Sequence, residues 1–388
     1  MNGQQRLLAA FRGEPTDFVP FAPNIYLWFY YHYYNKSLPS ELARAKHPFD
    51  VVRHLGGDIL ARWDTQWSTR EHYSAGQYSE EYKGDSGSDE PIITAFNHYP
   101  ARKTERHRQF ITPHGSLSQV WTFTPETGTD FEGEYWWKEW EEYDAVRFMV
   151  EATDYDFDAD HFRQWFNAVG DDGLVMLNIT QSPLKTLHWL AGPQNASLFI
   201  MEHPDELQAL AKIHEEKALA LLEKVVDLPE AQVFVSHDNL DSAFYPPYFY
   251  TDYCHSFFAR AAEIIHQRGK HLMVHACGRS KALLELIGES KIDALEGITP
   301  PPMGDVQLGD VRQKIGNENF TVNGGMDAPR LETETDAEAA LHAYTKDLFN
   351  SMGDKRHFIF ASSCSTSPLT PWENLIYFRD AARDYGRL

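Results

Sequence analysis

Cysteine is scarce in this sequence, and long apolar runs are missing. The chain has three cysteines among 388 residues, too few for a disulfide framework, and this fits a reducing, cytoplasmic location. No stretch of about 18 apolar residues occurs, so we expect no membrane-spanning segment. The N-terminal residues also lack the apolar core of a secretory signal peptide, and we expect no such signal.

Positive charge is also in short supply. The chain has 35 lysine and arginine side chains against 57 aspartate and glutamate side chains, a formal net charge of −22. This balance disfavours non-specific binding to nucleic acids or anionic membranes. No GxGxxG motif or phosphate-binding loop follows a candidate strand, so a dinucleotide or nucleoside triphosphate site has no support. We therefore expect a small-molecule substrate, with no nucleic acid and no membrane as partner.

Short apolar runs recur along the chain, and helical patterns separate most of them. The eight candidate strands lie near residues 19, 58, 174, 233, 272, 293, 320 and 358. Short apolar strands that alternate with helices are typical of a parallel sheet covered by helices. Eight such units predict an α/β fold of the (β/α)8 TIM-barrel type. An open, doubly wound sheet is the alternative.

Residues 65–150 have a different character from the rest of the chain. They are rich in serine, threonine, glycine, glutamate and tryptophan, and apolar and polar residues alternate from Leu117 to Phe123. Such alternation predicts strands with one buried face. We expect one barrel domain over residues 1–388, with residues 65–150 forming a β-hairpin insertion between the second and third strands.

A candidate metal site begins at His275 and Cys277, directly after a predicted buried strand. Imidazole nitrogen and thiolate sulfur are preferred zinc ligands. Alone the pattern is weak, since a buried cysteine beside a hydrogen-bonded histidine would look the same. In a barrel, however, all strands end at the face where the chemistry occurs. Glu296 ends the sixth predicted strand and Cys364 follows the eighth, so we predict zinc bound by His275, Cys277, Glu296 and Cys364.

Further candidates follow from the same rule. His237 and Asp238 end the fourth predicted strand and are candidate catalytic residues that orient substrate or donate a proton, with hydrogen bonding at the barrel rim as the alternative. Residues 24–34 are unusually aromatic, which predicts either a packed helix or the wall of an apolar pocket. The candidate substrate-binding residues are Trp28, Tyr30, Trp63, Asn178, Phe244, Tyr245 and Asp327.

Several motifs carry a resemblance to a known family. The opening from Arg6 to Pro15, the pair Val19-Pro20, and the closing pattern Ser363-Cys364 with residues 370–374 resemble the uroporphyrinogen decarboxylase superfamily. The HxC pattern at His275 with the later Cys364 is similar to the zinc motif of its corrinoid-linked methyltransferase branch. The resemblance spans nearly the whole chain, with residues 65–150 least covered. It implies a (β/α)8 barrel and zinc-assisted methyl transfer.

The chain also departs from that superfamily. The decarboxylases carry an arginine-containing motif after the first strand, whereas residues 24–28 here contain no arginine, so porphyrinogen decarboxylation is not expected. A DxHxxG cobalamin motif is also missing, which implies that any corrinoid (cobalamin) arrives on a separate protein.

The expected function is therefore demethylation of a methoxylated aromatic or similar small donor, with transfer of the methyl group to a corrinoid protein. The aromatic side chains near the site favour an apolar donor over a small charged one. Three alternatives stay open: methyl transfer from methylcobalamin to a thiol, a cofactor-free lyase related to the decarboxylases, and a non-catalytic binding barrel.

Overall fold

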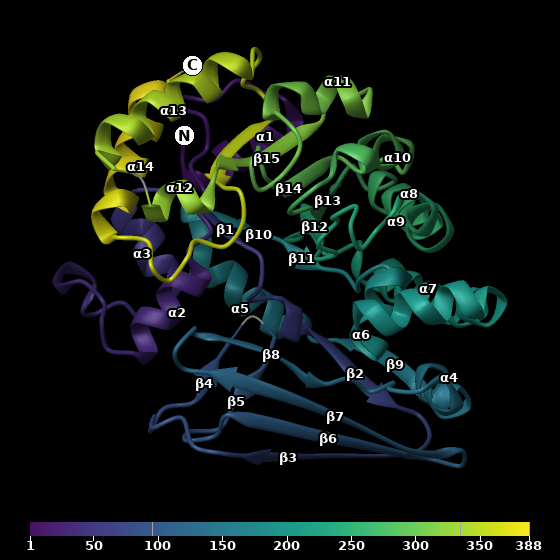
Figure 1. The fold of residues 1–388 in the computed structure, drawn as a ribbon. Coiled ribbons are helices and arrows are strands. Elements are labelled where there is room, and N and C mark those ends of the chain that lie inside the picture. The colour runs from purple at the N-terminus through teal and green to yellow at the C-terminus, as the bar shows by residue number, and fades with distance from the viewer. Residues whose placement is uncertain (95, 334, 388) are drawn as a thin grey trace.

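The computed structural model describes residues 1–94, 96–333 and 335–387. Its centre is a six-stranded parallel sheet in which the strands pair in chain order (Figure 1). These strands are β11 (Leu177–Asn178), β12 (Val233–Ser236), β13 (His271–His275), β14 (Ala294–Ile298), β15 (Thr321–Met326) and β16 (Phe358–Ser362). Every residue of β12, β14, β15 and β16 is buried, which explains why β12 and β16 are mostly continuous apolar runs.

The remaining parallel segments flank this sheet. β1 (Ile59–Ala61) pairs in parallel with β10 (Gly173–Val175), and β10 is separated from β11 only by Met176. The expected first strand, near residue 19, is an isolated parallel bridge between Phe21 and Phe360. Pro20 and Pro23 flank Phe21, and proline has no backbone N–H to give to a ladder.

The ladders of the described residues do not join into one closed sheet. Backbone hydrogen bonds nevertheless continue on both sides of Phe21: the Ala22 amide donates to the Phe360 carbonyl at 2.9 Å, and the Asp58 amide donates to the Phe21 carbonyl at 2.7 Å. The parallel α/β arrangement of the eight predicted segments is therefore confirmed, whereas complete barrel closure stays a prediction.

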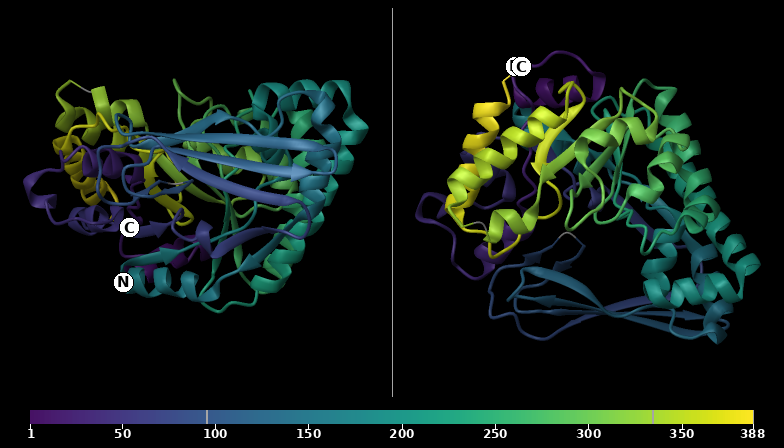
Figure 2. Two further views of the ribbon diagram at one scale, coloured as in Figure 1. Left: turned by 90° about the horizontal axis from the view of Figure 1, so that it is seen from below. Right: turned by 45° about the horizontal axis from the view of Figure 1, so that its top comes forward.

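Helices cover the outside of the parallel strands (Figure 1). None of the helices in the described part of the chain is both long and apolar enough to cross a membrane. The two ends of the chain lie close together (Figure 2), where Phe18 pairs with Arg387. The helices are α1 (Gly3–Arg12), α2 (Tyr26–Tyr34), α3 (Pro48–Leu55), α4 (Tyr143–Ala152), α5 (Ala159–Val169), α6 (Pro183–Glu202), α7 (Pro204–Val225), α8 (Pro247–Tyr250), α9 (Ser256–His266), α10 (Leu284–Glu289), α11 (Val311–Ile315), α12 (Ala328–Thr333), α13 (Ala337–Ser351) and α14 (Trp372–Tyr385).

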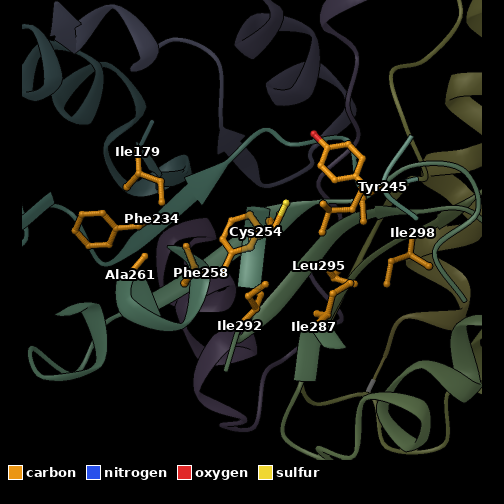
Figure 3. Close-up of a cluster of buried hydrophobic side chains, with 14 of the residues drawn as sticks. Ile179, Phe234, Tyr245, Cys254, Phe258, Ala261, Ile287, Ile292, Leu295 and Ile298 are labelled. Carbon is orange, nitrogen blue, oxygen red and sulfur yellow. The ribbon is translucent and has the colours of Figure 1, made fainter. Parts of the chain in front are cut away.

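One region of the core packs α9 and α10 against the parallel strands (Figure 3). Phe258 of α9 lies among side chains from β12 and β14, including Phe234 and Leu295, and all three are fully buried. Cys254 is buried in the same cluster, and its thiol contacts the Ser182 hydroxyl at 3.5 Å.

Residues 69–157 form antiparallel strands that lie in a layer of their own beside the parallel strands (Figure 1). The expected β-hairpin insertion over residues 65–150 stays a prediction, and the region contains more than one hairpin: it has a four-stranded sheet in the order β3-β6-β7-β8, and two further pairs, β2 with β9 and β4 with β5. An isolated hairpin is marginal in water. Here β7 buries Leu117, Gln119, Trp121 and Phe123, and added strands and α4 pack around it. The strands are β2 (Thr69–Tyr73), β3 (Gln77–Lys83), β4 (Ile92–Ile93), β5 (His98–Tyr99), β6 (Glu105–Thr112), β7 (Gly115–Thr124), β8 (Thr129–Glu134) and β9 (Thr153–Phe157).

Candidate metal centre

Three side chains with metal-binding atoms converge where the parallel strands end. His275 is the last residue of β13, Cys277 follows it in the next turn, and Cys364 follows β16. One ligand atom from each lies within 4.8 Å of the other two. β14 and β15 separate β13 from β16 in the sheet, so Cys364 comes from a strand that is not adjacent to that of His275. The fold therefore brings together three of the four predicted ligands.

Glu296, the fourth predicted ligand, contacts His275 directly. It lies opposite His275 in the parallel register of β13 and β14, which places both side chains on the same face of the sheet. One Glu296 oxygen bonds His275 Nδ1, and the other accepts a hydrogen bond from Arg62 Nη1 at 2.6 Å. A carboxylate in this position fixes the imidazole ring, and Nε2 is then the nitrogen that a metal ion could use.

The buried charges at this site compensate one another. Burial opposes ionisation of Glu296, but Arg62 and His275 outweigh it and hold the pKa of this carboxyl well below its ordinary value. Burial likewise lowers the pKa of His275, yet Glu296 and Cys364 together raise it to about 10. His275 is thus an imidazolium between two anions at neutral pH.

The two cysteines differ in their ionisation. The Cys277 thiol and His275 hold the pKa of Cys364 well below its ordinary value, although burial opposes this. The adjacent Cys364 and burial raise the pKa of Cys277 well above its ordinary value. The group therefore already favours one thiolate, and the thiolate is the form of cysteine that binds metals.

Gly297 permits the close packing beside His275. Its φ is +88°, a left-handed conformation that glycine adopts without strain. A Cβ atom at this position would lie 2.7 Å from His275 Cε1 and 2.9 Å from the Ser363 carbonyl oxygen. Any larger residue would displace the histidine or the turn that leads to Cys364.

His237 lies beside this group and is buried. Its ring stacks on Trp63, with 3.8 Å between ring centroids, and lies 6.4 Å from the His275 ring. Nε2 is 3.2 Å from the Arg62 carbonyl oxygen, which can only accept, so Nε2 carries the proton. Nδ1 then holds a lone pair, and no described residue bonds to it. Burial and the neighbouring His275 lower the pKa of His237 to about 3, so the ring is neutral and can accept a hydrogen bond.

Asp238 is engaged in a buried network. Its carboxylate accepts hydrogen bonds from the Ser182 backbone amide and from the hydroxyls of Ser182 and Ser236. Ser182 also caps the start of α6. Burial raises the pKa of Asp238 despite these bonds. These contacts match the alternative stated above, hydrogen bonding at the rim, and a catalytic role for Asp238 stays a prediction.

Three of the predicted substrate-binding residues lie in this region. Trp63 stacks on His237. Asn178 donates to the Arg62 carbonyl oxygen and to Thr65 Oγ1. The Tyr245 hydroxyl donates to the Asp238 carbonyl oxygen at 2.7 Å.

The other predicted substrate-binding residues have different surroundings. Trp28 stacks on Trp372 and donates to the Thr370 carbonyl oxygen. Tyr30 stacks on Tyr34. Both are buried in α2, which agrees with the packed-helix alternative for the aromatic stretch. Phe244 is 52% exposed, and Asp327 is buried directly after β15.

The sequence reasoning missed Arg62 and Asn323. Arg62 follows β1, and its guanidinium is 1% exposed against Glu296. Asn323 lies opposite Glu296 in the β14–β15 register, is fully buried, and has no hydrogen-bond partner for either amide atom among the described residues. Both lie at or near the carboxyl end of a parallel strand, so the rule that selected His237 and Glu296 could have found them.

Comparison with known proteins agrees with the parallel α/β fold. The family model for Uroporphyrinogen decarboxylase (URO-D) matches residues 167–385, more than half of the chain. The chain belongs to the uroporphyrinogen decarboxylase family. The match contains β12 to β16 and therefore all three converging ligands. This family has a TIM-barrel fold.

Solved structures extend the likeness beyond the family match. A methyltransferase from Methanosarcina mazei aligns over 99% of both chains with 14% sequence identity and a TM-score of 0.62. A psychrophilic xylanase aligns over 58% of this chain and 82% of its own, with 14% identity and a TM-score of 0.36. A xylanase from Thermoanaerobacterium saccharolyticum aligns over 56% of this chain and 74% of its own, with 11% identity and a TM-score of 0.34. No curated protein matches the chain. The alignment with the methyltransferase thus also spans residues outside 167–385.

Proposed function

We propose that this protein is a zinc-dependent methyltransferase that moves a methyl group from a small donor, such as a methoxylated aromatic compound, to a corrinoid held by a separate protein. The observation that carries the proposal is the convergence of His275, Cys277 and Cys364 within 4.8 Å. The fold shared with a methyltransferase over the whole chain supports it.

The donor set suits zinc. Two sulfur atoms and one imidazole nitrogen form three corners of a tetrahedral site, and a catalytic zinc keeps its fourth position for substrate. Zinc bound there would supply a Lewis acid that polarises a donor oxygen or keeps a sulfur ionised. Glu296 orients His275 from behind, and it would have to leave His275 Nδ1 to serve as the predicted fourth ligand.

The side chains around the three ligands suit the uncharged, aromatic part of such a donor. The Trp63–His237 stack offers a flat apolar wall, and the neutral His237 can accept a hydrogen bond through Nδ1. The roles of His237 and Asp238 in catalysis belong to this proposal.

The proposal includes the finer architecture. The segment at Phe21 joins β16 to the β1 side through backbone hydrogen bonds, which supports an eight-stranded barrel of one domain with the antiparallel region as an insertion. A cytoplasmic location is also part of the proposal, since a chain with three cysteines has too few for a disulfide framework.

Metal analysis of purified variants tests the metal centre. We expect about one zinc per wild-type chain and a large loss in Cys277→Ser and Cys364→Ser, because serine replaces the soft thiolate with a weakly acidic hydroxyl. Cys254→Ser is the matched control, since Cys254 lies in the core away from the three ligands, and should keep its zinc. Full zinc content in both site variants would refute the site.

Methyl transfer is tested separately. Reduced cobalamin is mixed with the wild-type protein and a methoxylated aromatic compound, and its methylation is followed by absorbance. The expected product pair is methylcobalamin and the free phenol, formed as the methyl C–O bond breaks with its electron pair on oxygen. Equal turnover after complete zinc removal would exclude the zinc-dependent mechanism.

A further inference from the structure

A large cavity in the described structure lies apart from the three ligands. It encloses about 1090 Å³ between the antiparallel strands β2, β3, β6 and β7 and the elements β9, α4, α6 and α7. These elements can be followed in Figure 1. His275, Cys277 and Cys364 do not line it, but Asn178 at the end of β11 does. Its volume is at the upper end of the range for small-molecule sites.

One wall of the cavity is aromatic. Phe96, Trp121 and Trp189 all line it and pack against one another with ring centroids 5.5 to 5.6 Å apart. Trp121 is only 2% exposed, so its position is fixed by packing. Such a wall presents ring faces and edges to a planar aromatic ligand.

Polar atoms of the same lining residues lack partners. Among the described residues, the buried side-chain atoms without a hydrogen bond include Gln66 Nε2, Arg108 Nε, Trp121 Nε1, and the hydroxyl oxygens of Thr69 and Thr180, and all five residues line the cavity. The three nitrogen atoms can only donate, and the two hydroxyls can donate as well. Buried donors without partners are costly, so this lining suits a ligand rich in acceptor oxygens.

The charged side chains of the cavity also favour a ligand with acceptor oxygens. In a chain with a net charge of −22, its lining has four basic and two acidic side chains: Arg70, Arg106, Arg108 and Lys217 against Glu71 and Glu80. Three of the basic groups pair with carboxylates. Arg108 instead bonds the Gln119 amide and lies over the Trp136 ring at 5.5 Å, and it forms no ion pair with any carboxylate in the described ranges. The Glu71 and Glu132 carboxyl groups lie near enough to act on this charge, but neither pairs with it directly, so Arg108 can still bind an anion.

The cavity is linked to the candidate metal centre by contacts between side chains. Phe96 contacts Trp63, with ring centroids 5.8 Å apart, and Trp63 stacks on His237. Asn178 lines the cavity and bonds the carbonyl oxygen of Arg62, whose guanidinium bonds Glu296. A ligand held in the cavity thus lies beside the residues that surround His275.

We infer that this cavity binds an aromatic carboxylate, with the ring against Phe96, Trp121 and Trp189 and the carboxylate at Arg108. That this ligand is the methyl donor, a methoxybenzoate, rests on the proposed function; that it binds in the cavity does not. No bond is made or broken in the binding itself.

Calorimetric titration with 3-methoxybenzoate tests the site, beside anisole, which lacks the carboxylate, and acetate, which lacks the ring. We expect 3-methoxybenzoate to bind far more tightly than the other two. Arg108→Met keeps an unbranched apolar stem but removes the charge and the donors, and should weaken binding of 3-methoxybenzoate at least tenfold. Arg147→Met is the control, because Arg147 pairs with Glu151 on the exposed side of α4 and does not line the cavity; its affinity should equal that of the wild type.

Thr180→Val serves as a second variant, since it removes one unpartnered hydroxyl without changing the shape, and should weaken binding several-fold. Circular dichroism establishes that each variant is folded. The inference is overturned if 3-methoxybenzoate does not bind the wild type, if anisole binds as tightly, or if folded Arg108→Met and Thr180→Val both bind like the wild type.

The same titration on Cys277→Ser separates this inference from the proposed function. Binding that persists without zinc supports the cavity even if methyl transfer fails. Zinc-dependent methylation of cobalamin without any carboxylate binding would support the proposed function and overturn the cavity.

Discussion

Replacement of Arg62 by methionine tests the buried charge network most directly. The Arg62 guanidinium and the Glu296 carboxylate are both 1% exposed, and Nη1 lies 2.6 Å from Oε1. Methionine fills a similar volume but removes the charge, so Glu296 loses one of its two compensating partners. The other partner, His275, stays in contact with Glu296.

The expected cost is about 3 kcal/mol in the free energy of unfolding. Removing one partner of a buried ion pair costs about 3–5 kcal/mol, because the remaining charge is left in a medium of low polarity. The lower end applies here because His275 still faces the carboxylate. Glu296→Gln should cost a similar amount by leaving Arg62 unpaired. The double variant should cost less than the two single changes together, by about 2 kcal/mol.

Urea unfolding in the presence of a chelator measures these values without a contribution from bound metal. Arg163→Met is the matched control, because Arg163 forms a 3.0 Å ion pair with Glu230 at the surface, where its side chain is 44% exposed. Such exposed pairs contribute about 0–1 kcal/mol. If Arg62→Met costs no more than Arg163→Met, or if the two single changes are additive, the buried network is refuted.

Two further predictions concern packing and pH. Leu295→Ala, in the fully buried cluster of Figure 3, should lower the free energy of unfolding by about 2–5 kcal/mol. The control Leu369→Ala, at a side chain that is 66% exposed, should change it by less than about 0.5 kcal/mol. Equal free energies of unfolding for the two variants in urea titrations would contradict the burial of Leu295. Burial raises the pKa of Asp58 to about 6, although Arg6 opposes this. The native state therefore binds this proton more tightly than the unfolded chain does. The resulting stability is present below about pH 4 and is lost as the pH rises through 6. The stability of Asp58→Asn relative to the wild type should therefore rise by up to about 3 kcal/mol between pH 4 and pH 7, since a tenfold difference in proton affinity corresponds to about 1.4 kcal/mol. A stability difference that does not change with pH would show that Asp58 titrates normally.

Much of the parallel framework could be predicted from the sequence because its strands are buried on both faces. Such strands must consist of consecutive apolar residues, and runs such as residues 272–274 and 358–361 are visible without any tertiary information. The exception, near residue 19, has prolines where a regular strand would need N–H donors. The antiparallel region was harder, because an alternating pattern identifies a strand such as β7 but not the number of strands that pair with it.

The candidate site, like the fold, could be predicted from the sequence only in part. The sequence by itself determined that His275, Cys277 and Cys364 sit at strand ends, since parallel strands all end at one edge. It could not determine which atoms meet there. Only the tertiary structure placed Arg62 against Glu296 and put Glu296 behind His275, because these contacts depend on register and side-chain direction across strands far apart in the chain. The large cavity is also a tertiary feature, built from residues spread between Gln66 and Lys217, and no local pattern marks a space enclosed by several elements.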